Sequence, residues 1–406
     1  MGRWNKVCVV GLGYIGLPTA SILATKGYLV LGVDVAERTV EMINKGKIHI
    51  VEPDLDILVK SAVNSGNLRA SLVPDKADVF IIAVPTPFKD SYKPDLSYVE
   101  SATSTITPYL EEGNLVILES TSPVGTTDKI YLQILESRPE LKGKISIAHC
   151  PERVLPGQIL KELVNNDRII GGVDSRSAEE AKAFYETFVN GEIYTTNAKT
   201  AELTKLAENS FRDVNIAFAN ELSIICHELG INVWEVIKLA NKHPRVNILQ
   251  PGPGVGGHCI AVDPWFIVDA APNHARLIRT ARHVNDSKPA HIVERVKEKA
   301  SRFKEPIIAC LGLSFKADID DLRESPAVEI VKMLANDNVG KLLVAEPHVK
   351  KLPDSLAKFA EIELTEFNDA LHRADIVLLL VNHRAFKDVD RDLIKGKIVI
   401  DTRGMW

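Results

Sequence analysis

Several familiar signals are missing from this chain of 406 residues, and each absence removes a class of protein. The five cysteines are odd in number and scattered, without CxxC or Cys/His spacing, so neither a disulfide framework nor a metal site is predicted. No apolar run approaches the roughly 20 residues of a membrane span. The chain enters an apolar strand within a few residues of its start, which predicts no signal peptide. Together these absences favour the reducing cytoplasm.

The net charge of the chain is also small. A formal net charge of −5 gives no reason to expect nucleic acid or an anionic membrane as a partner. An anionic substrate would therefore need local basic groups. What is present, 45% hydrophobic and 25% charged residues, is ordinary for a globular enzyme, and the length implies two or three domains.

The first 34 residues carry the pattern of a dinucleotide-binding unit. A strand over Lys6 to Val10 runs into Gly11-Leu12-Gly13-Tyr14-Ile15-Gly16, a helix is expected over Leu17 to Lys26, and a second strand over Tyr28 to Val33 ends at Asp34. This order of strand, glycine turn, helix, strand and acid is typical of a Rossmann βαβ unit. The helix N-terminus would face a pyrophosphate.

The acid at the end of the second strand bears on which cofactor binds. Asp34 should accept hydrogen bonds from the ribose hydroxyls and repel a 2′-phosphate, which favours NAD over NADP. Arg38 leaves the choice open, because an arginine can also bind that phosphate or stack on adenine.

Two further strands of this half end in hydroxyl side chains. Val79 to Val84 leads to Thr86, and Leu115 to Leu118 leads to Thr121, so both threonines are candidates for cofactor contact, with helix capping as the alternative. A strand over Ile145 to Ala148, expected to be the last of this half, leads to Cys150-Pro151-Glu152-Arg153. An acidic and a basic residue, Glu152 and Arg153, should therefore lie beside the same ligand-binding edge of the sheet.

A glycine-rich loop, Gly252 to Gly257, precedes a cysteine. Cys259 and, four residues later, Asp263 follow glycines that let a substrate approach without Cβ clashes. A nicotinamide moves hydrides, and a nearby thiol can hold an aldehyde or acyl group covalently, so the pairing predicts oxidation beyond the aldehyde to an acid. The alternative for a lone cysteine is a small buried hydrophobe. Cys150 is the other candidate nucleophile.

A long helix is expected over Thr200 to Leu229, ended by Gly230. Lys205, Asn209 and Arg212 share one face and suit an anionic or polyhydroxyl substrate. The alternative is a solvated face, although Glu202, Glu208 and Asp213 can serve as that face. About 45 Å of helix can bridge two domains and support dimer packing.

The C-terminal part repeats the order of the first. Its expected strands are Pro306 to Leu311, Leu342 to Ala345, Ile376 to Val381 and Ile398 to Ile400. It lacks the glycine fingerprint, so it should bind something other than a dinucleotide pyrophosphate. The prediction is an α/β protein with two Rossmann-like doubly wound domains, 1–196 and 299–406, joined by a central helical segment, 197–298. Lys316, Arg323 and Arg403 could hold phosphates or close over the cofactor, with surface decoration as the alternative.

The chain resembles the UDP-glucose/GDP-mannose dehydrogenase family over essentially its whole length. The matching motifs are Val10 to Pro18, Glu119-Ser120-Thr121-Ser122-Pro123-Val124-Gly125-Thr126, Cys150 to Arg153, Ala201 to Asn209, Gly256-Gly257-His258-Cys259 and Phe315-Lys316. His149 departs from the family, where an aromatic is common. The stretch from His243 to Gly254 is most like the branch that acts on UDP-linked N-acetylmannosamine, with the N-acetylglucosamine branch near it.

The resemblance implies roles for individual residues. Cys259 would be the nucleophile, Lys205 and Asp263 would handle protons, Asn209 and Thr121 would position water and oxyanion, and Glu152 would assist hydrolysis. Substrate contacts would come from Arg153, Val154, Lys205, Asn209, Arg212, His243, Arg245, Gly256, Phe315, Lys316 and Arg403. NAD contacts would come from Gly11, Gly13, Tyr14, Ile15, Gly16, Asp34, Arg38, Thr86, Thr121 and Arg323.

The implied reaction oxidises the C6 alcohol of a UDP-sugar to a carboxylate with two NAD⁺, as for a surface polysaccharide precursor. The aldehyde would be captured as an imine on Lys205 or directly by Cys259, and the sequence leaves both open. Family members form their sites in dimers, so a homodimer or higher oligomer is expected. A two-electron β-hydroxy acid dehydrogenase or a sugar-nucleotide-binding protein without turnover would not need Cys259.

Overall fold

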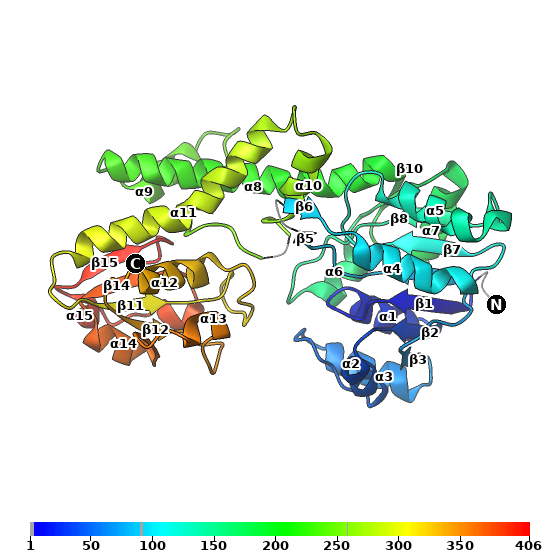
Figure 1. Ribbon diagram of the computed structural model, residues 1–406, viewed down its shortest axis with the longest axis horizontal. Coiled ribbons are helices and arrows are strands. Elements are labelled where there is room, and N and C mark those ends of the chain that lie inside the picture. The colour runs from blue at the N-terminus through cyan, green and yellow to red at the C-terminus, as the bar shows by residue number, and fades with distance from the viewer. Residues whose placement is uncertain (1–3, 90–91, 258) are drawn as a thin grey trace. The chain divides into compact units, whose positions relative to one another are not determined.

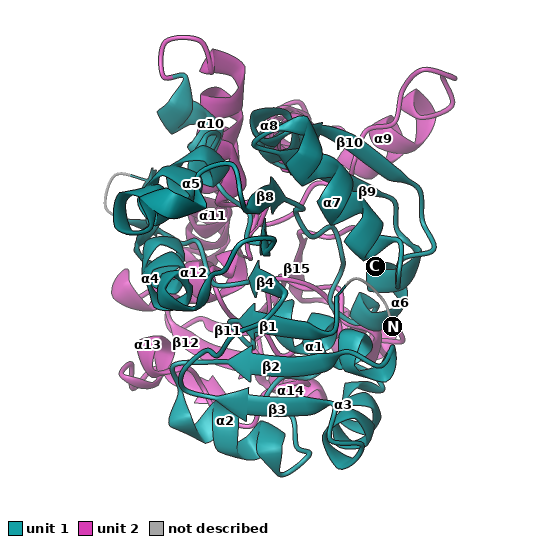
Figure 2. Cartoon of the chain, turned by 90° about the vertical axis from the view of Figure 1, so that its right-hand side faces the viewer, with its two compact units in different colours: residues 1–208, 265–271 teal, residues 209–264, 272–406 magenta. Residues whose placement is uncertain are grey.

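The chain divides into two compact units, which are coloured separately in Figure 2. The structure is a computed structural model that describes residues 4–89, 92–257 and 259–406. Unit 1 comprises residues 1–208 with 265–271, and unit 2 comprises residues 209–264 with 272–406. Within the described residues, no helix is both long and apolar enough to cross a membrane.

Unit 1 is built on a sheet with the strand order β10-β9-β8-β7-β4-β1-β2-β3 (Figure 1). The strands are β1 (Lys6–Val10), β2 (Leu29–Val33), β3 (Leu68–Ser71), β4 (Val79–Ile82), β7 (Leu115–Leu118), β8 (Ser146–His149), β9 (Arg168–Gly172) and β10 (Ile193–Asn197). Neighbouring strands pair in parallel, except that β8 and β9 are antiparallel. The central strands are continuous apolar runs because helices cover both faces of the sheet.

Helices pack on both faces of this sheet. They are α1 (Gly16–Thr25), α2 (Glu37–Asn44), α3 (Leu55–Asn64), α4 (Ser97–Ile106), α5 (Thr126–Ser137), α6 (Ile159–Asn165) and α7 (Ser175–Tyr185), with short 3₁₀ turns η2 (Thr107–Tyr109) and η3 (Pro139–Leu141). Side chains of α1, α3, α6 and α7 share one core with the sheet, and those of α4 and α5 share the other. A small hairpin, β5 (Phe88–Lys89) with β6 (Lys93–Pro94), follows β4.

Long helices lead into the C-terminal layer. The helix α8 (Ala198–Glu228) begins in unit 1 and ends in unit 2, and α10 (Asp263–Ala270) begins in unit 2 and continues in unit 1. Unit 2 also holds α9 (Val233–Ala240) and α11 (Arg276–Ala300). The N-terminus of α9 is fixed by Asn232, whose side chain accepts hydrogen bonds from the backbone N–H of Trp234 and Glu235.

The C-terminal layer of unit 2 is a parallel sheet with the order β13-β12-β11-β14-β15. Its strands are β11 (Ile307–Leu311), β12 (Lys341–Ala345), β13 (Ile362–Leu364), β14 (Ile376–Leu379) and β15 (Ile398–Asp401). Its helices are α12 (Pro326–Asn336), α13 (Asp354–Ala357), α14 (Phe367–Arg373) and α15 (Arg391–Ile394), with the 3₁₀ turn η4 (Arg384–Phe386). The helices α11 and α12 share a core with one face of this sheet, and α14 covers the other.

The predicted fold class is confirmed, with two Rossmann-like layers and a long central helix. One strand prediction was wrong, because the strand expected over Ile145 to Ala148 is not the last of its half. The strands β9 and β10 follow it, and β3 was missed as well. Both β3 and β10 are edge strands with polar residues among the apolar ones, so they lack the continuous apolar run that identified the central strands.

Candidate active site

The glycine-rich loop of unit 2 packs tightly against the C-terminal layer. A Cβ atom on Gly256 would lie 2.4 Å from the carbonyl oxygen of Glu324 and 2.9 Å from Cβ of Phe315. Only glycine fits such a close approach without displacing backbone. The structure therefore brings Gly256 and Phe315 together, as expected for two residues of one substrate site.

The candidate nucleophile lies in the turn after this loop. Cys259 is exposed, and its carbonyl oxygen accepts hydrogen bonds from the N–H groups of Val262 and Asp263 at 3.1 and 2.9 Å, just before α10. The exposure contradicts the alternative of a buried packing residue. His258, which belongs to the same motif, lies outside the described residues.

The structure also brings two of the predicted catalytic polar residues together. Asn209 on α8 donates from Nδ2 to Oδ2 of Asp263 at 2.5 Å, and both residues belong to unit 2. Asp263 is only 3% exposed. A buried carboxylate that accepts an amide hydrogen bond is held in one orientation, which a proton-transferring group requires.

The face of α8 that carries Lys205, Asn209 and Arg212 is only partly the ordinary solvent-exposed helix face considered as the alternative. Lys205 is half-buried, Asn209 is buried and Arg212 is exposed. The expectation that Glu202 and Asp213 form the solvated face was wrong, because both side chains are fully buried. Glu202 accepts hydrogen bonds from the backbone N–H groups of residues 125 and 127, and Asp213 pairs with a buried arginine of α11. Their charges are thus compensated inside the protein.

In unit 1, the candidate acid Glu152 is held from two sides. Its Oε2 accepts from Nη1 of Arg168 at 2.7 Å, and its Oε1 accepts from the backbone N–H of Arg153 at 2.7 Å. Arg168 and Glu152 are both buried, so the ion pair holds the Glu152 carboxylate in one position. The Arg153 side chain, a predicted substrate contact, pairs with Glu208 of α8 at 2.7 Å instead. Val154 packs against the core.

A second buried carboxyl lies behind Glu152. Burial and the charge of Glu152 raise the pKa of Glu119 to about 7, although its hydrogen bond from the Tyr185 hydroxyl at 2.6 Å opposes this. Burial also raises the pKa of Cys150 to about 12. A buried thiol with so high a pKa is a poor nucleophile, which leaves Cys259 as the better candidate.

The neighbouring His149 stands at a position where an aromatic residue is common in the family that the chain resembles. It is fully buried, and burial lowers its pKa to about 3, with the charge of Lys205 acting in the same direction. The ring is therefore neutral at physiological pH. This accounts physically for a histidine at a position where an aromatic side chain is common.

The residues of the fingerprint in unit 1 fit a dinucleotide. A Cβ on Gly16 would lie 1.8 Å from the carbonyl oxygen of Gly11, so the first turn of α1 packs directly on the glycine turn, while Gly13 has open space around it. Asp34 accepts from the backbone N–H of Leu12 at 3.0 Å and remains half-exposed. These contacts leave room for a pyrophosphate at the helix N-terminus and a carboxylate for the ribose.

The other predicted cofactor residues differ in their surroundings. Tyr14 and Ile15 are half-buried beside the turn, and Arg38 is exposed at a hollow that His49 also lines. Thr86 donates from its hydroxyl to the carbonyl oxygen of Thr121 at 2.5 Å, so the two strand ends meet as expected. Arg323 belongs to unit 2, where its Nε and Nη2 donate to the two carboxylate oxygens of Asp321.

The remaining substrate-side predictions lie in unit 2. Burial lowers the pKa of Arg403 to about 10, and its Nε donates to the carbonyl oxygen of Leu380 at 3.0 Å. Lys316, His243 and Arg245 are exposed. The predicted site residues are therefore divided between the units, and a single site that combines Lys205, Glu152 and Cys259 stays a prediction.

One cluster has the composition of a metal site. Ligand atoms of Asp318, His348 and His383 lie within 4.8 Å of one another. Nδ1 of His383, however, already accepts the backbone N–H of Asp318 at 2.9 Å, and the Asp318 carboxylate pairs with Arg384. The first hydrogen bond uses the one lone pair that Nδ1 of His383 could offer to a metal, so no metal is assigned here.

The sequence reasoning missed the residues that hold the site residues in place. Arg168 begins a strand that was not predicted, and Glu119 belongs to a motif but received no role. A motif with an acid directly after a buried apolar strand could have identified Glu119. Arg168 offered no comparable signal, because a single arginine at a strand start is usually exposed.

Profiles of the UDP-glucose/GDP-mannose dehydrogenase family match almost the entire chain. The NAD binding domain matches residues 5–189, the central domain residues 199–287, and the UDP binding domain residues 309–406. These three regions include the fingerprint, the long helix with the cysteine loop, and the second Rossmann-like layer.

Relatives match over nearly the full length. An NDP-N-acetyl-D-galactosaminuronic acid dehydrogenase of Ralstonia nicotianae is 60% identical, over 99% of this chain and 96% of its own. A UDP-N-acetyl-D-mannosamine dehydrogenase of Campylobacter jejuni is 59% identical, over 97% of this chain and 99% of its own. The solved structure of a UDP-D-ManNAc dehydrogenase from Pyrococcus horikoshii superposes with a TM-score of 0.88 at 40% identity, covering 99% and 96% of the two chains.

Proposed function

Because the chain belongs to the UDP-glucose/GDP-mannose dehydrogenase family, we propose that it oxidises C6 of a UDP-linked 2-acetamido sugar to the uronic acid. It is an NAD-dependent UDP-sugar dehydrogenase, because relatives that are 53–59% identical to it over nearly the whole chain are UDP-sugar dehydrogenases. The observation that carries the four-electron reaction is the exposed thiol of Cys259 directly after a glycine loop packed on the C-terminal layer. A reaction that stopped at the aldehyde would not need it.

NAD⁺, when bound, supplies a hydride acceptor for each of two oxidation steps. The protein's own groups carry out the rest. Lys205 and Asp263 move the proton of the C6 alcohol, and Cys259 adds to the resulting aldehyde as a thiohemiacetal, which is oxidised to a thioester. A water that Asn209 and Thr121 position then hydrolyses the thioester and releases the acid. Both catalytic residues near the loop, Asn209 and Asp263, are already oriented by their mutual hydrogen bond.

Glu152 has a narrower role than a free base. Both of its oxygens accept hydrogen bonds from protein groups, one from the backbone N–H of Arg153 and one from the side chain of Arg168. Each carboxylate oxygen has a second lone pair, so Glu152 can still orient a water during hydrolysis. We propose this orienting role, together with the division into functional segments 1–196, 197–298 and 299–406.

We propose UDP-N-acetyl-D-mannosamine as the substrate, as for a surface polysaccharide precursor. The support is the segment from His243 to Asn247, which is exposed and leads into the glycine loop, so it can reach a sugar held at Cys259. An N-acetylgalactosamine-type sugar is the second candidate, because a relative with that name is as similar as the mannosamine relatives. UDP-N-acetylglucosamine is a third.

An apolar row on α8 supports a homodimer or higher oligomer. Phe211, Phe218 and Ile225 recur every seven residues and are 70%, 54% and 43% exposed. Seven-residue spacing places them on one side of the helix, where a second copy could pack. We propose that this row is covered in the assembled enzyme.

The decisive experiment measures NADH released per sugar nucleotide consumed. Two NADH for each sugar, without free aldehyde, are expected, and a ratio near one would refute the thioester route. Cys259→Ala should abolish acid formation while leaving NAD binding intact, and Cys150→Ala is the matched control because its buried thiol takes no part. The result would reverse the assignment if only Cys150→Ala stopped turnover.

A substrate panel then resolves the sugar. UDP-ManNAc should exceed its C2 epimer UDP-GlcNAc, and UDP-GalNAc, which differs at both C2 and C4, by about tenfold or more in kcat/KM, because a site that pairs a polar group rejects an analogue that leaves it unpaired. UDP-glucose and GDP-mannose, which have no acetamido group, are the control substrates. A preference for UDP-GlcNAc or UDP-GalNAc would keep the family and refute the mannosamine assignment.

A further inference from the structure

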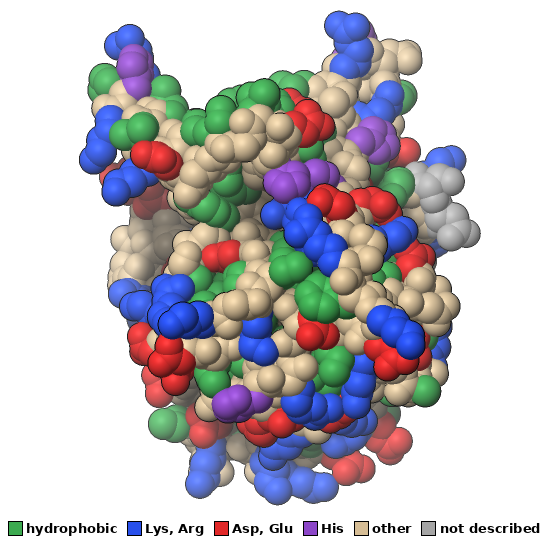
Figure 3. All heavy atoms as spheres, turned by 90° about the vertical axis from the view of Figure 1, so that its left-hand side faces the viewer, with side chains coloured by type: hydrophobic (Ala, Val, Ile, Leu, Met, Phe, Trp, Pro, Cys, Tyr) green, Lys and Arg blue, Asp and Glu red, His purple; other side chains and the backbone are tan. Residues whose placement is uncertain are grey.

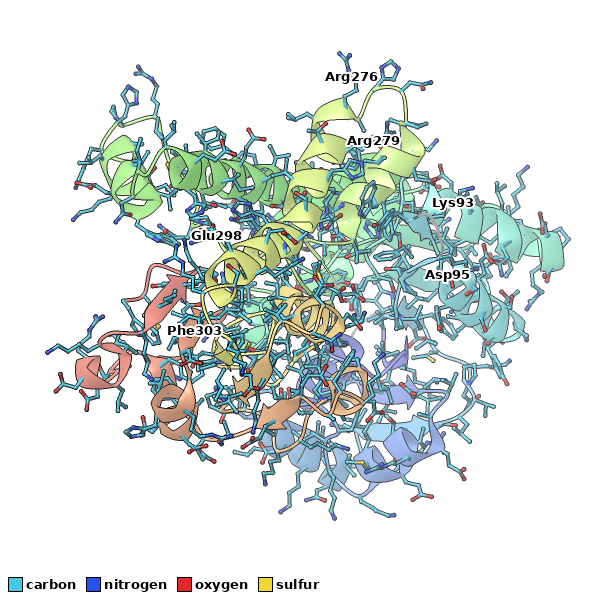
Figure 4. The ribbon with its side chains drawn as sticks, turned by 60° about the vertical axis from the view of Figure 1, so that its left-hand side comes forward. Lys93, Asp95, Arg276, Arg279, Glu298 and Phe303 are labelled. Atoms are coloured by element: carbon cyan, nitrogen blue, oxygen red, sulfur yellow. The ribbon has the colours of Figure 1, made fainter. Side chains whose placement is uncertain are left out.

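A chain of buried polar side chains lies between α8 and α11 in unit 2, and the reaction described above does not use it. Its members are Asp213 and Asn220 on α8 and Arg282 and Asn285 on α11, and each is at most 1% exposed. Figure 4 shows α11 with Arg276 and Arg279 labelled near its start and Glu298 near its end. Polar groups buried so completely are costly unless each has a partner, so their arrangement is tightly specified.

The hydrogen bonds among these buried side chains form a connected series that begins at the Asp213 carboxylate. Arg282 donates from Nη1 to the Asp213 carboxylate at 2.5 Å, and its Nη2 donates to Asp286. Asn285 donates from Nδ2 to the same Asp213 carboxylate at 2.8 Å, which turns its own side-chain oxygen toward Asn220. Asn220 donates to that oxygen at 2.9 Å.

The last hydrogen bond of the chain reaches the cysteine loop. With its amino group committed to Asn285, Asn220 presents its oxygen to the backbone N–H of Gly252, which donates at 2.9 Å. Gly252 opens the loop that leads to Cys259 seven residues later. The carboxylate of Asp213 thus determines, through two amide groups, which atom faces the loop.

The anchored residue has a second close neighbour on its other side. A Cβ on Gly252 would lie 2.7 Å from Nη1 of Arg403, the buried arginine of the C-terminal layer. The backbone at this point is therefore held by the hydrogen bond that it donates to Asn220 of α8, and it packs on a guanidinium predicted to contact substrate. A small shift of Gly252 would move the loop and disturb Arg403 together.

We propose that Asn220 and Asn285 are positioning residues, which hold the cysteine loop in the geometry that its reaction needs. The proposal rests on the function assigned to Cys259 above. Neither asparagine is placed against substrate or cofactor, and they act through the backbone of Gly252. A displacement of about 1 Å in a reacting group can reduce a rate by roughly a hundredfold, so such an anchor has kinetic consequences.

A neighbouring contact between the same two helices provides a matched control. Lys288 on α11 donates to the hydroxyl of Ser223 on α8 at 2.7 Å, one turn beyond the Asn220–Asn285 pair. Lys288 is buried, so this contact resembles the chain in depth. The hydrogen bonds found for Ser223 connect it to Lys288 and to its own helix, and none of them reaches the loop.

The test compares Asn220→Leu with Ser223→Ala. Leucine keeps the volume of the side chain and removes the acceptor for the Gly252 N–H. We expect kcat to fall by about tenfold to a hundredfold while KM for NAD⁺ stays within twofold, because the fingerprint is untouched. The rate at which iodoacetamide alkylates Cys259 in the folded enzyme should change at least about threefold. Ser223→Ala should lower the unfolding temperature and leave kcat and the alkylation rate within twofold.

Two results would overturn the proposal. One is an Asn220→Leu enzyme with wild-type kcat and alkylation rate; the other is an equal loss of both in Ser223→Ala, which would indicate general destabilisation. If Asn220→Leu does not fold, amide hydrogen exchange of the wild type decides, since Gly252 must be protected far more than an open loop. Alkylation and exchange need no sugar, so they still test the anchor if no sugar nucleotide is oxidised and the proposed function fails.

Discussion

The two Rossmann-like layers of this chain share a turn and differ in what surrounds it. Gly11 after β1 and Gly312 after β11 both have φ of +92°. The carboxylate at the end of the next strand accepts from the backbone N–H after that glycine in both layers. Asp34 accepts from Leu12 at 3.0 Å in one layer, and Glu346 accepts from Leu313 at 2.7 Å in the other.

The difference lies in what else the carboxylate binds. Asp34 remains half-exposed, so a ribose can reach it. Glu346 is buried, and it also accepts hydrogen bonds from Nε2 of His383 at 3.0 Å and from the N–H groups of Ser314 and His348. The backbone N–H of Asp318 donates to Nδ1 of that histidine, so the ring proton is on Nε2.

The C-terminal carboxylate is therefore used within the fold, whereas the N-terminal one is available to a ligand. The helix that follows the turn differs too, because α1 begins at Gly16 directly beside Gly11, while α12 begins only at Pro326. A strand-turn-strand unit alone does not make a dinucleotide site. The open carboxylate and the close helix N-terminus do.

The surface of the C-terminal layer carries no broad basic area on the face drawn in Figure 3, so an anionic ligand would be bound by a few individual basic groups. On the face drawn in Figure 3, lysine and arginine side chains are interspersed with acidic ones and do not form one broad basic surface. The UDP binding domain of this family matches residues 309–406. The contact of individual groups such as Arg403 with a diphosphate stays a prediction.

The largest effects are expected from matched substitutions at the two turn glycines. Gly11→Ala places a Cβ 2.5 Å from the carbonyl oxygen of Ala83, and Gly312→Ala places one 2.4 Å from Cβ of Val381, both at positive φ. Each should cost about 1–3 kcal/mol of stability. Gly11→Ala alone should weaken NAD⁺ binding, by at least about a hundredfold, whereas Gly312→Ala should weaken UDP binding. Calorimetric titration with each ligand checks this, and a loss of NAD⁺ affinity in Gly312→Ala alone would contradict the comparison.

A smaller effect is expected from the paired carboxylates. Asp34→Asn should reduce the preference for NAD⁺ over NADP⁺ by at least about tenfold in kcat/KM, because the charge that repels a 2′-phosphate is removed. Glu346→Gln should leave this ratio unchanged, since Glu346 is enclosed by His383. If wild-type enzyme uses both cofactors equally, Arg38 rather than Asp34 determines the choice.

How far the sequence predicts the site depends on whether a residue acts through a local motif. The strands β1, β4 and β7 and the helix α8 follow from apolar runs and helical spacing, and the family motifs identify Asn209 and Asp263 as site residues. Even so, 54 residues separate Asn209 from Asp263 in sequence, and their hydrogen bond was not predicted.

The residues that sequence reasoning misjudged are compensated by distant partners. Glu202 and Asp213 were expected in solvent because charged residues on a helix usually are. Glu202 instead binds the start of α5, and Asp213 pairs with Arg282, which is 69 residues away. No local pattern distinguishes a solvated acid from one that a remote segment neutralises, so the buried chain that ends at Gly252 was invisible in the sequence.

The two layers also hold buried carboxyls with opposite dependence on pH. In unit 1, burial and Glu152 raise the pKa of Glu119 to about 7 from an ordinary 4.5. The unfolded chain then binds fewer protons than the folded one between these values, so stability should fall as pH rises from about 4.5 to 7 and level off above. Glu119→Gln removes this loss, and the decrease in unfolding temperature from pH 5 to 8 should shrink by a few degrees. An unchanged profile would show that Glu119 is ionised throughout.

The smallest effect is expected at Glu346, with the opposite sign. Burial raises the pKa of this carboxyl, but the hydrogen bonds from His383 and the N–H of Leu313 outweigh it, so the folded pKa lies below the ordinary 4.5. Its contribution to stability is complete above the unfolded pKa and is lost as pH falls through the folded value. Glu346→Gln should therefore lower the unfolding temperature at pH 7 and make its decline below pH 4.5 shallower. His383→Gln is the partner control, because it removes the same hydrogen bond from the other side. Thermal unfolding between pH 3 and 7 measures both variants, and a decline as steep as that of the wild type would mean that the enclosed carboxylate of the C-terminal layer carries no acid-sensitive stability.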